Sequence, residues 1–233
     1  MRFMILILRM MLVGCPPKMN KRFKYPRTLH VPFSPGITSD DKVLPNLDHF
    51  IHKEVVVTLK MDGECSTLYP DYYSHARSLD SNNHPSRNWL KAFHSTIAHF
   101  IPENGRICGE NMYAKHSIEY NELESYFYVF SIWDSENYCY SWADTTQWCR
   151  DHGVSIVPEL WSGIFDMRAI TTIANNLDTD TQEGFVIRLS EGFHYNDFGT
   201  SIAKYVRRGH VTSEDHWMNQ SLTQNKLKGC QSD

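Results

Sequence analysis

A run of β-branched residues that ends at a charged, glycine-containing turn constrains the fold of this chain most strongly. Residues 54–59 read Glu-Val-Val-Val-Thr-Leu, a composition typical of a β-strand. The next five residues, Lys-Met-Asp-Gly-Glu at 60–64, interrupt the pattern, and Gly63 permits a tight turn there. Residues 65–69 return to a strand-like composition, so we expect them to form the partner strand.

The rest of the chain alternates irregularly between strand and helix patterns. Residues 24–42 carry three prolines and a glycine, which predicts an extended, turn-rich segment. From Pro85 onward, apolar residues at 89, 90, 93, 97 and 101 form one helical stripe. Further strands are expected at 107–113, 126–132, 185–189 and 202–206, a short apolar segment at 154–160, and further helices at 142–152 and 166–177. This order lacks a repeated strand–helix–strand unit and therefore predicts an α+β fold with mostly antiparallel sheets.

Composition excludes several classes of protein. The net charge of −4 argues against a protein that coats nucleic acid by bulk electrostatics, although a local basic groove remains compatible with it. The six cysteines are scattered without a CxxC pair, which indicates reduced thiols rather than a disulfide framework or a zinc site. Among the twelve histidines there is no HExxH motif, and His94 and His99, five residues apart, do not share a helical face well.

The first residues differ from the rest. Residues 4–15 are apolar and end in Leu-Val-Gly-Cys, which is similar to a bacterial lipoprotein cleavage site. Arg9 interrupts this run, which is too short to span a bilayer. We interpret residues 1–18 as an extension outside the fold, ahead of a start at Met19, and expect a cytoplasmic protein without a membrane association.

Six short motifs follow one another in a fixed order, and each alone is a weak signal. They are Lys60–Glu64, Ser74–Ser78 around Arg77, Gly109–Ala114 with Glu110, Phe127–Asp134 with Phe130, Glu183–Arg188, and Ala203–Arg207 with Lys204. Together, over roughly Tyr25 to Arg207, the series resembles the covalent nucleotidyltransferases, which comprise DNA ligases, RNA ligases and mRNA capping enzymes. The Gly-Glu-Asn-Met-Tyr-Ala and Phe-Tyr-Val-Phe segments are most similar to the RNA-ligase branch.

The resemblance implies a nucleotidyltransferase core, an ATP-grasp-like ligase fold of mostly antiparallel sheets with flanking helices. It also implies an ATP-dependent RNA ligase that joins 3′-hydroxyl and 5′-phosphate ends through a lysyl-AMP intermediate and an adenylated 5′ end. Lys60 would be the nucleophile. It can attack the α-phosphate of ATP only as a neutral amine, and an unperturbed lysine has a pKa of about 10.4. Burial and nearby cations would have to lower that pKa, and Lys204 and Arg207 are candidate cations.

The same resemblance implies a role for each remaining motif residue. Asp62, Glu110 and Glu183 would bind Mg²⁺ or Mn²⁺, directly or through water. Arg77 would contact the ribose, as would Glu110. Phe130 would contact the adenine, and Lys204 the phosphates. Carboxylate oxygens suit these metals. Tyr128 and Phe130 share a strand face by alternation, so spacing alone does not choose between them.

The sequence departs from the family pattern in two places. The commonest form of the last motif is Lys-x-Lys, but Val206 stands where the second lysine is expected. Arg207 would point to the opposite face of a regular strand and could replace that lysine only if the strand bends. Residues 209–233 are too few for an oligonucleotide-binding barrel. We therefore expect an adenylyltransferase domain at 19–210 and a polar tail at 211–233 without a barrel, which favours a compact RNA-type ligase.

Three alternatives remain open from the sequence. A small ATP-dependent DNA ligase would seal DNA ends faster than RNA ends, and a capping guanylyltransferase would react with GTP. A binding module with the ligase fold would only hold a nucleotide or an RNA end, but the joint presence of Lys60, Glu110, Glu183 and Lys204 argues against lost catalysis. The expected partners are RNA ends, splinted or in a nicked duplex. Whether a protein partner supplies RNA binding stays open.

Overall fold

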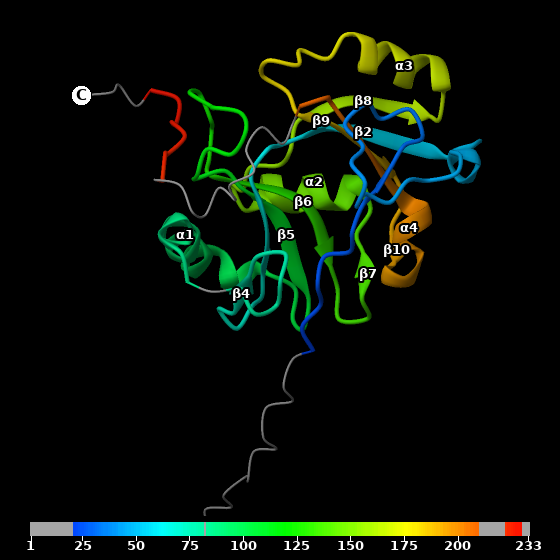
Figure 1. Cartoon of the computed structure of the whole chain (residues 1–233). Coiled ribbons are helices and arrows are strands. Elements are labelled where there is room, and N and C mark those ends of the chain that lie inside the picture. Colours follow the sequence, from blue (N-terminus) through cyan, green and yellow to red (C-terminus); the bar gives the residue numbers. More distant parts are fainter. Residues whose placement is uncertain (1–20, 82, 210–221, 230–233) are drawn as a thin grey trace, which may run out of the picture.

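Two β-sheets form the centre of the structure, a computed structural model that describes residues 21–81, 83–209 and 222–229 (Figure 1). The first sheet has the strand order β1-β11-β9-β2-β8. Its strands are β1 (Leu29–His30), β11 (Ile202–Val206), β9 (Gly184–Leu189), β2 (Glu54–Lys60) and β8 (Glu159–Ile164). The second sheet has the order β10-β7-β6-β5-β3-β4. Its strands are β10 (Phe193–His194), β7 (Tyr138–Cys139), β6 (Phe127–Trp133), β5 (Arg106–Asn111), β3 (Glu64–Leu68) and β4 (Ser74–His75).

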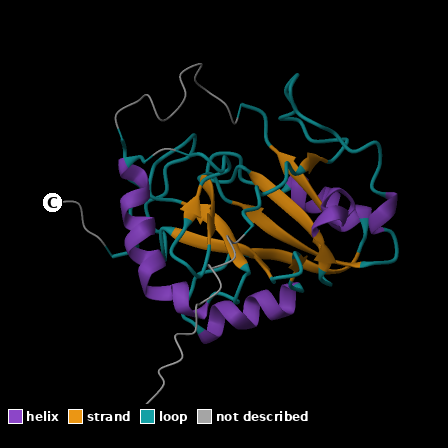
Figure 2. Ribbon diagram, turned by 90° about the horizontal axis from the view of Figure 1, so that it is seen from below, coloured by secondary structure: helices purple, strands orange, loops and turns teal. Residues whose placement is uncertain are grey.

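The strand pairs within these sheets are antiparallel, apart from the short parallel pair of β1 with β11. Four α-helices are described: α1 (Asn88–Ile97), α2 (Trp142–Asp151), α3 (Met167–Asn175) and α4 (Phe198–Ser201). Four 3-10 turns are described as well, at Asp48–Phe50, Pro85–Arg87, Ala98–Phe100 and Tyr195–Asp197. Figure 2 shows the helices around the edges of the strands. The predicted α+β class with mostly antiparallel sheets is confirmed.

Each sheet buries its outer face under helices. Ile170 of α3 packs with Val55, Val57 and Ile187 of the first sheet. Leu90 and Ile97 of α1, together with Cys149 of α2, pack against β5 and β6 of the second sheet. Val56 of β2 and Tyr128 of β6 share a further apolar cluster with Met61, which lies between β2 and β3. β2 is therefore buried on both faces, which explains why its sequence is an unbroken apolar run instead of an alternating one.

Local capping signals explain where the helices begin and end. The Ser141 hydroxyl accepts a hydrogen bond of 3.0 Å from Asp144 N at the start of α2. Asp166 caps α3 in the same way, by accepting from Arg168 N at 2.8 Å. Gly153 follows α2 with φ of +62°, a conformation that ends a helix without steric cost. The predicted helices at 142–152 and 166–177 are confirmed, and both are slightly shorter than expected.

The charged turn after β2 does not close a hairpin, which corrects the expectation that residues 65–69 pair with residues 54–59. β2 pairs with β8 and β9, whereas β3 pairs with β4 and β5 in the other sheet. The turn at residues 61–63 thus carries the chain from one sheet to the other. Both edges of β2 are already occupied, so no edge is left for β3. Lys60 lies where the two sheets diverge.

Part of the expected tail belongs to the fold. Asn225 is 1% exposed, and its side-chain amide donates to Met112 O at 2.7 Å and to Ala114 O at 3.3 Å. Residues 222–229 therefore pack on the loop that follows β5, and the expected boundary at 210 is wrong for this segment. The interpretation of residues 1–18 as an extension, and of 211–221 and 230–233 as tail, lies outside the described residues. Within the described ranges no helix is long and apolar enough to cross a membrane.

Candidate active site

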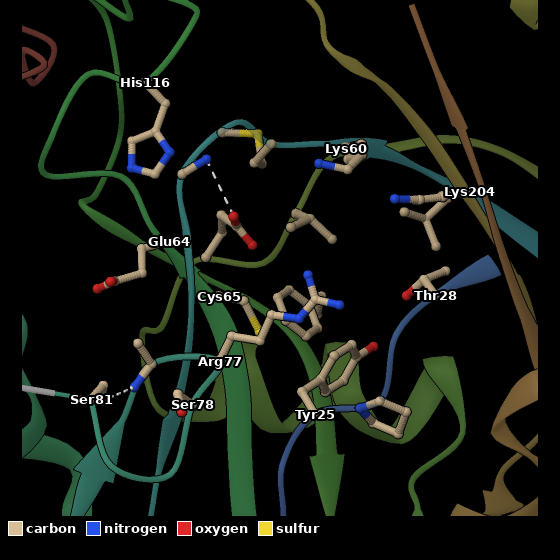
Figure 3. A pocket seen from close by; sticks show the side chains of 18 of the residues that line it. Tyr25, Thr28, Lys60, Glu64, Cys65, Arg77, Ser78, Ser81, His116 and Lys204 are labelled. Carbon is tan, nitrogen blue, oxygen red and sulfur yellow. Dashed lines mark hydrogen bonds between the residues drawn. The ribbon is translucent and has the colours of Figure 1, made fainter. Parts of the chain in front are cut away.

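A pocket of about 730 Å³ opens between the two sheets. Its lining includes five of the seven predicted site residues: Lys60, Arg77, Glu110, Phe130 and Lys204. They come from β2, the loop after β4, β5, β6 and β11, so segments far apart in the sequence meet here. Figure 3 shows the amino groups of Lys60 and Lys204 on one side of the pocket and the Arg77 guanidinium reaching toward them. Asp62 and Glu183 are not among the lining residues.

Lys60 is the last residue of β2 and is held by Glu183. Its ammonium group donates a hydrogen bond to Glu183 Oε2. In the sheet, Lys60 lies directly opposite Gly184 of β9, which brings the preceding Glu183 beside it. Burial alone lowers the pKa of Lys60, but the charges of Glu183 and Glu110 outweigh burial and leave that pKa above its ordinary value. Lys60 is therefore protonated in the free protein.

Glu110 lies in β5 beneath the turn. Its Oε1 accepts a hydrogen bond of 3.2 Å from Gly63 N, which ties it to the turn that carries Lys60. Burial raises the pKa of Glu110 to about 8, with Glu183 and Asp62 adding to the rise and Lys60 opposing it. Two carboxylates and one ammonium group thus share a poorly hydrated space. A cation added beside Glu110 would favour its ionised form and lower its pKa.

Asp62 has a different set of contacts from the one expected. Its Oδ2 accepts hydrogen bonds from Ser117 N at 2.8 Å, Ser117 Oγ at 2.7 Å and Ile118 N at 2.8 Å. Asp62 is 8% exposed, and its carboxylate anchors the turn to the 117–118 loop. This anchoring is a structural role that sequence spacing did not reveal. A contact of Asp62 with a metal-bound water stays a prediction.

The three predicted metal carboxylates do not form a protein-only metal cage. Within residues 21–81, 83–209 and 222–229, no group of three or more His, Cys, Asp or Glu side chains is arranged to hold a metal ion. The assignment of Asp62, Glu110 and Glu183 to a metal ion or to metal-bound water stays a prediction, and Asp62 Oδ2 is engaged by the 117–118 loop. Glu110 and Glu183 still fit magnesium, which is commonly bound by one or two carboxylates together with substrate phosphates.

Phe130 reaches the pocket because β6 has a bulge. Cys108 of β5 pairs with Ser131, but the next residue, Gly109, pairs with Val129, so Phe130 has no partner in the ladder. Its carbonyl oxygen, which has no partner in the strand ladder, accepts a hydrogen bond from the Arg188 guanidinium. Phe130 lines the pocket, whereas Tyr128 is 6% exposed and its hydroxyl accepts from Glu124 N at 2.8 Å. The structure thus favours Phe130 over Tyr128 as the aromatic side chain that a base would contact.

Lys204 lines the pocket without the second lysine of a Lys-x-Lys motif. Val206 is 1% exposed and belongs to the core. Arg207 does not replace the missing cation, because its guanidinium donates to Arg208 O at 3.2 Å and it is not among the lining residues. Burial lowers the pKa of Lys204, Asp41 raises it and Lys60 lowers it further, with a net decrease.

Sequence reasoning missed three groups at the site. Arg188 is 5% exposed, lines the pocket and lies over the Trp142 ring at 4.9 Å. Tyr25 also lines the pocket, with its ring centroid 4.9 Å from that of Phe130. Asp41 contacts Lys204 from the N-terminal segment. Arg188 ends the Glu183–Arg188 motif, so its position was available from the sequence. Nothing in the sequence pointed to Tyr25 or Asp41, since both depend on how residues 21–43 cross the sheets.

The family model for RNA ligases matches residues 53–206. This range contains Lys60, Arg77, Glu110, Phe130, Glu183 and Lys204, and the pocket described above lies largely within it. The fold and the site define a nucleotidyltransferase core with a lysine at the pocket. The chain belongs to the RNA ligase family.

Solved structures share the fold at low sequence identity. The RNA ligase of Naegleria gruberi with pyrophosphate has a TM-score of 0.51 and 17% identity, over 86% of this chain and 63% of that chain. A variant of that enzyme with ATP and manganese has a TM-score of 0.51 and 15% identity, over 84% of this chain and 63% of that chain. The present chain thus matches less than two thirds of the length of each. No curated protein gave a match.

Proposed function

We propose that this chain is the catalytic core of an ATP-dependent RNA ligase, with Lys60 as the residue that becomes linked to AMP. The observation that carries the proposal is the position of Lys60, whose ammonium group is paired with Glu183 at a pocket lined also by Glu110 and Lys204. A buried, charged lysine beside other buried charged groups at a pocket is typical of a reactive site. Lysines in ordinary ion pairs lie on the protein surface.

In the proposed first step, Lys60 Nζ attacks the α-phosphorus of ATP. A nitrogen–phosphorus bond forms, the bond from that phosphorus to the pyrophosphate oxygen breaks, and pyrophosphate leaves. The amine must first lose its proton, and Glu183 is in position to take it because the two groups are hydrogen-bonded.

Lys204 would hold the phosphates of ATP. Arg77 and Glu110 would hold the ribose, and Phe130 would contact the adenine ring. Mg²⁺ or Mn²⁺ held by Glu110, Glu183 and the phosphates would neutralise phosphate charge.

In the proposed later steps, AMP passes from Lys60 to the 5′-phosphate of an RNA strand. The 3′-hydroxyl of a neighbouring strand then attacks the adenylated end, and AMP leaves as the phosphodiester bond forms. The protein contributes mainly positioning and compensation of charge in these transfers. The proposed partners are RNA ends in a splinted or nicked duplex, and a protein partner that adds RNA-binding surface is compatible with the acidic net charge of the chain.

The test is incubation of the protein with α-labelled ATP and Mg²⁺, followed by a denaturing gel. We expect a label that resists denaturation, is released by acid and is absent in Lys60→Ala. Lys115→Ala, which removes an exposed lysine paired with Glu119, is the matched control and should label normally. Robust labelling of Lys60→Ala would exclude the proposed nucleophile. Absence of label in the wild type would favour a binding module, and labelling by GTP instead of ATP would indicate a capping enzyme.

Sealing assays define the substrate. We expect faster sealing of a nick with an RNA 3′-hydroxyl strand than of the same nick with a DNA 3′-hydroxyl strand. The second candidate function, a small DNA ligase, would give the reverse order.

A further inference from the structure

A carboxylate from the N-terminal segment holds the ammonium group of Lys204. Asp41 Oδ1 lies 3.5 Å from Lys204 Nζ and 3.1 Å from His30 Nε2. The other oxygen, Oδ2, accepts hydrogen bonds from Thr38 N at 3.1 Å and from Thr38 Oγ1 at 2.8 Å. Both oxygens of the Asp41 carboxylate are therefore held in place. The carboxylate can position the Lys204 ammonium group without losing further conformational freedom.

His30 is fixed as firmly as Asp41. It is 0% exposed and lies directly opposite Lys204 in the parallel pairing of β1 with β11. Its Nδ1 lies 2.9 Å from Ser34 Oγ, and that hydroxyl also accepts from Val206 N at 2.9 Å. A continuous series of polar contacts thus runs from the backbone of Val206, through Ser34, His30 and Asp41, to the ammonium group of Lys204.

The combination of Ser34, His30 and Asp41 is not a second nucleophilic site. Ser34 is 4% exposed, and its hydroxyl is engaged by the main chain at Val206. None of the three residues lines the pocket, so no substrate reaches them there. Lys204 does line the pocket, and the three residues can act on a ligand in it only through Lys204.

Because β11 has no second lysine at the pocket, the contacts that hold Lys204 in place become more important. Val206 is part of the core and Arg207 is directed elsewhere, so Lys204 is the cation that β11 presents to the pocket. The Lys204 side chain is 18% exposed and has Lys60 as a repelling neighbour. An ammonium group in this position needs a counter-charge to stay charged and in place.

We propose that Asp41 is a positioning residue for ATP, which fixes Lys204 where the triphosphate enters and so compensates for the absence of a second lysine. His30 and Thr38 hold Asp41 for this purpose. The inference rests on the proposed function, because it assigns the ligand of Lys204 as the phosphates of ATP. It concerns a group outside the motif series, in the segment before the first motif.

The first test measures single-turnover labelling of Asp41→Asn at varied ATP concentrations. We expect labelling at saturating ATP to be at least about tenfold slower than in the wild type, because a displaced charge contact costs about that much or more. The matched control is Asp40→Asn, which removes a neighbouring carboxylate whose side chain is 78% exposed and should leave labelling unchanged. Wild-type or faster labelling by Asp41→Asn would overturn the proposal.

A double-mutant cycle separates positioning from a general structural effect. If Asp41 acts through Lys204, adding Asp41→Asn to Lys204→Ala should slow labelling by less than about twofold, because the two changes remove one interaction. A structural role predicts losses that multiply, which would refute the proposal. Should Asp41→Asn fail to fold, Thr38→Val takes its place, and a loss of about threefold is expected. It removes the hydroxyl that contacts Asp41 Oδ2 at 2.8 Å and Asp40 Oδ1 at 2.7 Å, and Asp40→Asn controls for the second contact.

A binding measurement keeps this inference distinct from the proposed function. In a Lys60→Ala background no lysyl-AMP can form, and calorimetry with ATP and Mg²⁺ reports binding alone. We expect Asp41→Asn to weaken ATP binding by about tenfold when Lys204 is present and to have no effect in Lys204→Ala. If this dependence holds while the wild type takes no label, the proposed chemistry fails and the role of Asp41 stands. Unchanged ATP binding refutes the role of Asp41.

Discussion

The Lys60 ammonium group and the Glu183 carboxylate form an ion pair between neighbouring strands of one sheet, with Lys60 opposite Gly184 in the register of β2 and β9. The pairing keeps Lys60, the proposed nucleophile, protonated although it is buried, because the charges of the Glu183 and Glu110 carboxylates raise its pKa. We infer that the free protein stores the amine in an unreactive form.

Glu183→Gln should lower the pKa of Lys60, since the largest contribution that raises it is removed and burial remains. Lys60 should then react faster than in the wild type with an amine-acylating reagent at a fixed pH below its pKa, as measured by mass spectrometry of the modified peptide. The control is Glu119→Gln, which removes the exposed partner of Lys115 and should barely change the reactivity of Lys115. Equal reactivity of Lys60 in the wild type and in Glu183→Gln would show that Glu183 does not keep Lys60 protonated.

Glu110→Gln should stabilise the protein at alkaline pH. The pKa of Glu110 is about 8 in the folded protein, against an ordinary value of 4.5 that applies to the unfolded chain. Glu110 therefore binds its proton more tightly in the folded protein. Between these values the folded state binds more protons than the unfolded chain, so stability falls as pH rises from about 4.5 to about 8. Glutamine cannot ionise and avoids this loss.

Urea unfolding of Glu110→Gln should therefore give a free energy within about 1 kcal/mol of the wild-type value at about pH 5 and a value higher than wild type by about 4 kcal/mol at about pH 8. Glu103→Gln, which changes an exposed carboxylate, is the control and should show no such difference between the two pH values. A gain of equal size at both pH values would mean that ionisation of Glu110 is not its cause.

Gly184→Ala should destabilise the fold and misplace Glu183. A Cβ at this position would lie 1.9 Å from Tyr205 O of β11, a backbone atom that cannot move aside cheaply. We expect a loss of about 1–3 kcal/mol in the free energy of unfolding and strongly reduced labelling by ATP. Gly199→Ala is the control, because a Cβ there meets open space in α4 and alanine favours a helix. Wild-type stability and labelling of Gly184→Ala would show that β11 can retreat.

Phe130→Leu should weaken recognition of ATP with little change in thermal stability. The ring lines the pocket from an unpaired bulge position, and a stacked aromatic contact contributes about 0.5–1.5 kcal/mol. The ATP concentration for half-maximal labelling should thus rise by about 2- to 13-fold. Tyr128→Phe removes a hydroxyl outside the pocket and should leave this concentration unchanged. The opposite pattern would assign the adenine contact to Tyr128.

Most of the strand and helix segments could be predicted because their signals are local. Residues 202–206 form β11 as expected, and the runs at 54–59 and 185–189 form β2 and β9 with one extra residue each. The two-residue strands β1, β4, β7 and β10 were not predicted, since a strand of that length has no periodicity to detect. The partner of β2 was predicted wrongly, because a turn with glycine looks the same whether it closes a hairpin or connects two sheets.

The sequence by itself determined the family, most of the elements and five of the residues that line the pocket. Their motifs follow one another in an order that chance rarely produces; the residues are Lys60, Arg77, Glu110, Phe130 and Lys204. Only the tertiary structure decided how they work together. It tied Asp62 to the 117–118 loop, turned Phe130 into the pocket through a bulge, and placed Asp41 against Lys204. These contacts join residues far apart in the chain, and hydrogen bonds and charges act over a few ångströms of space, whatever the separation in sequence.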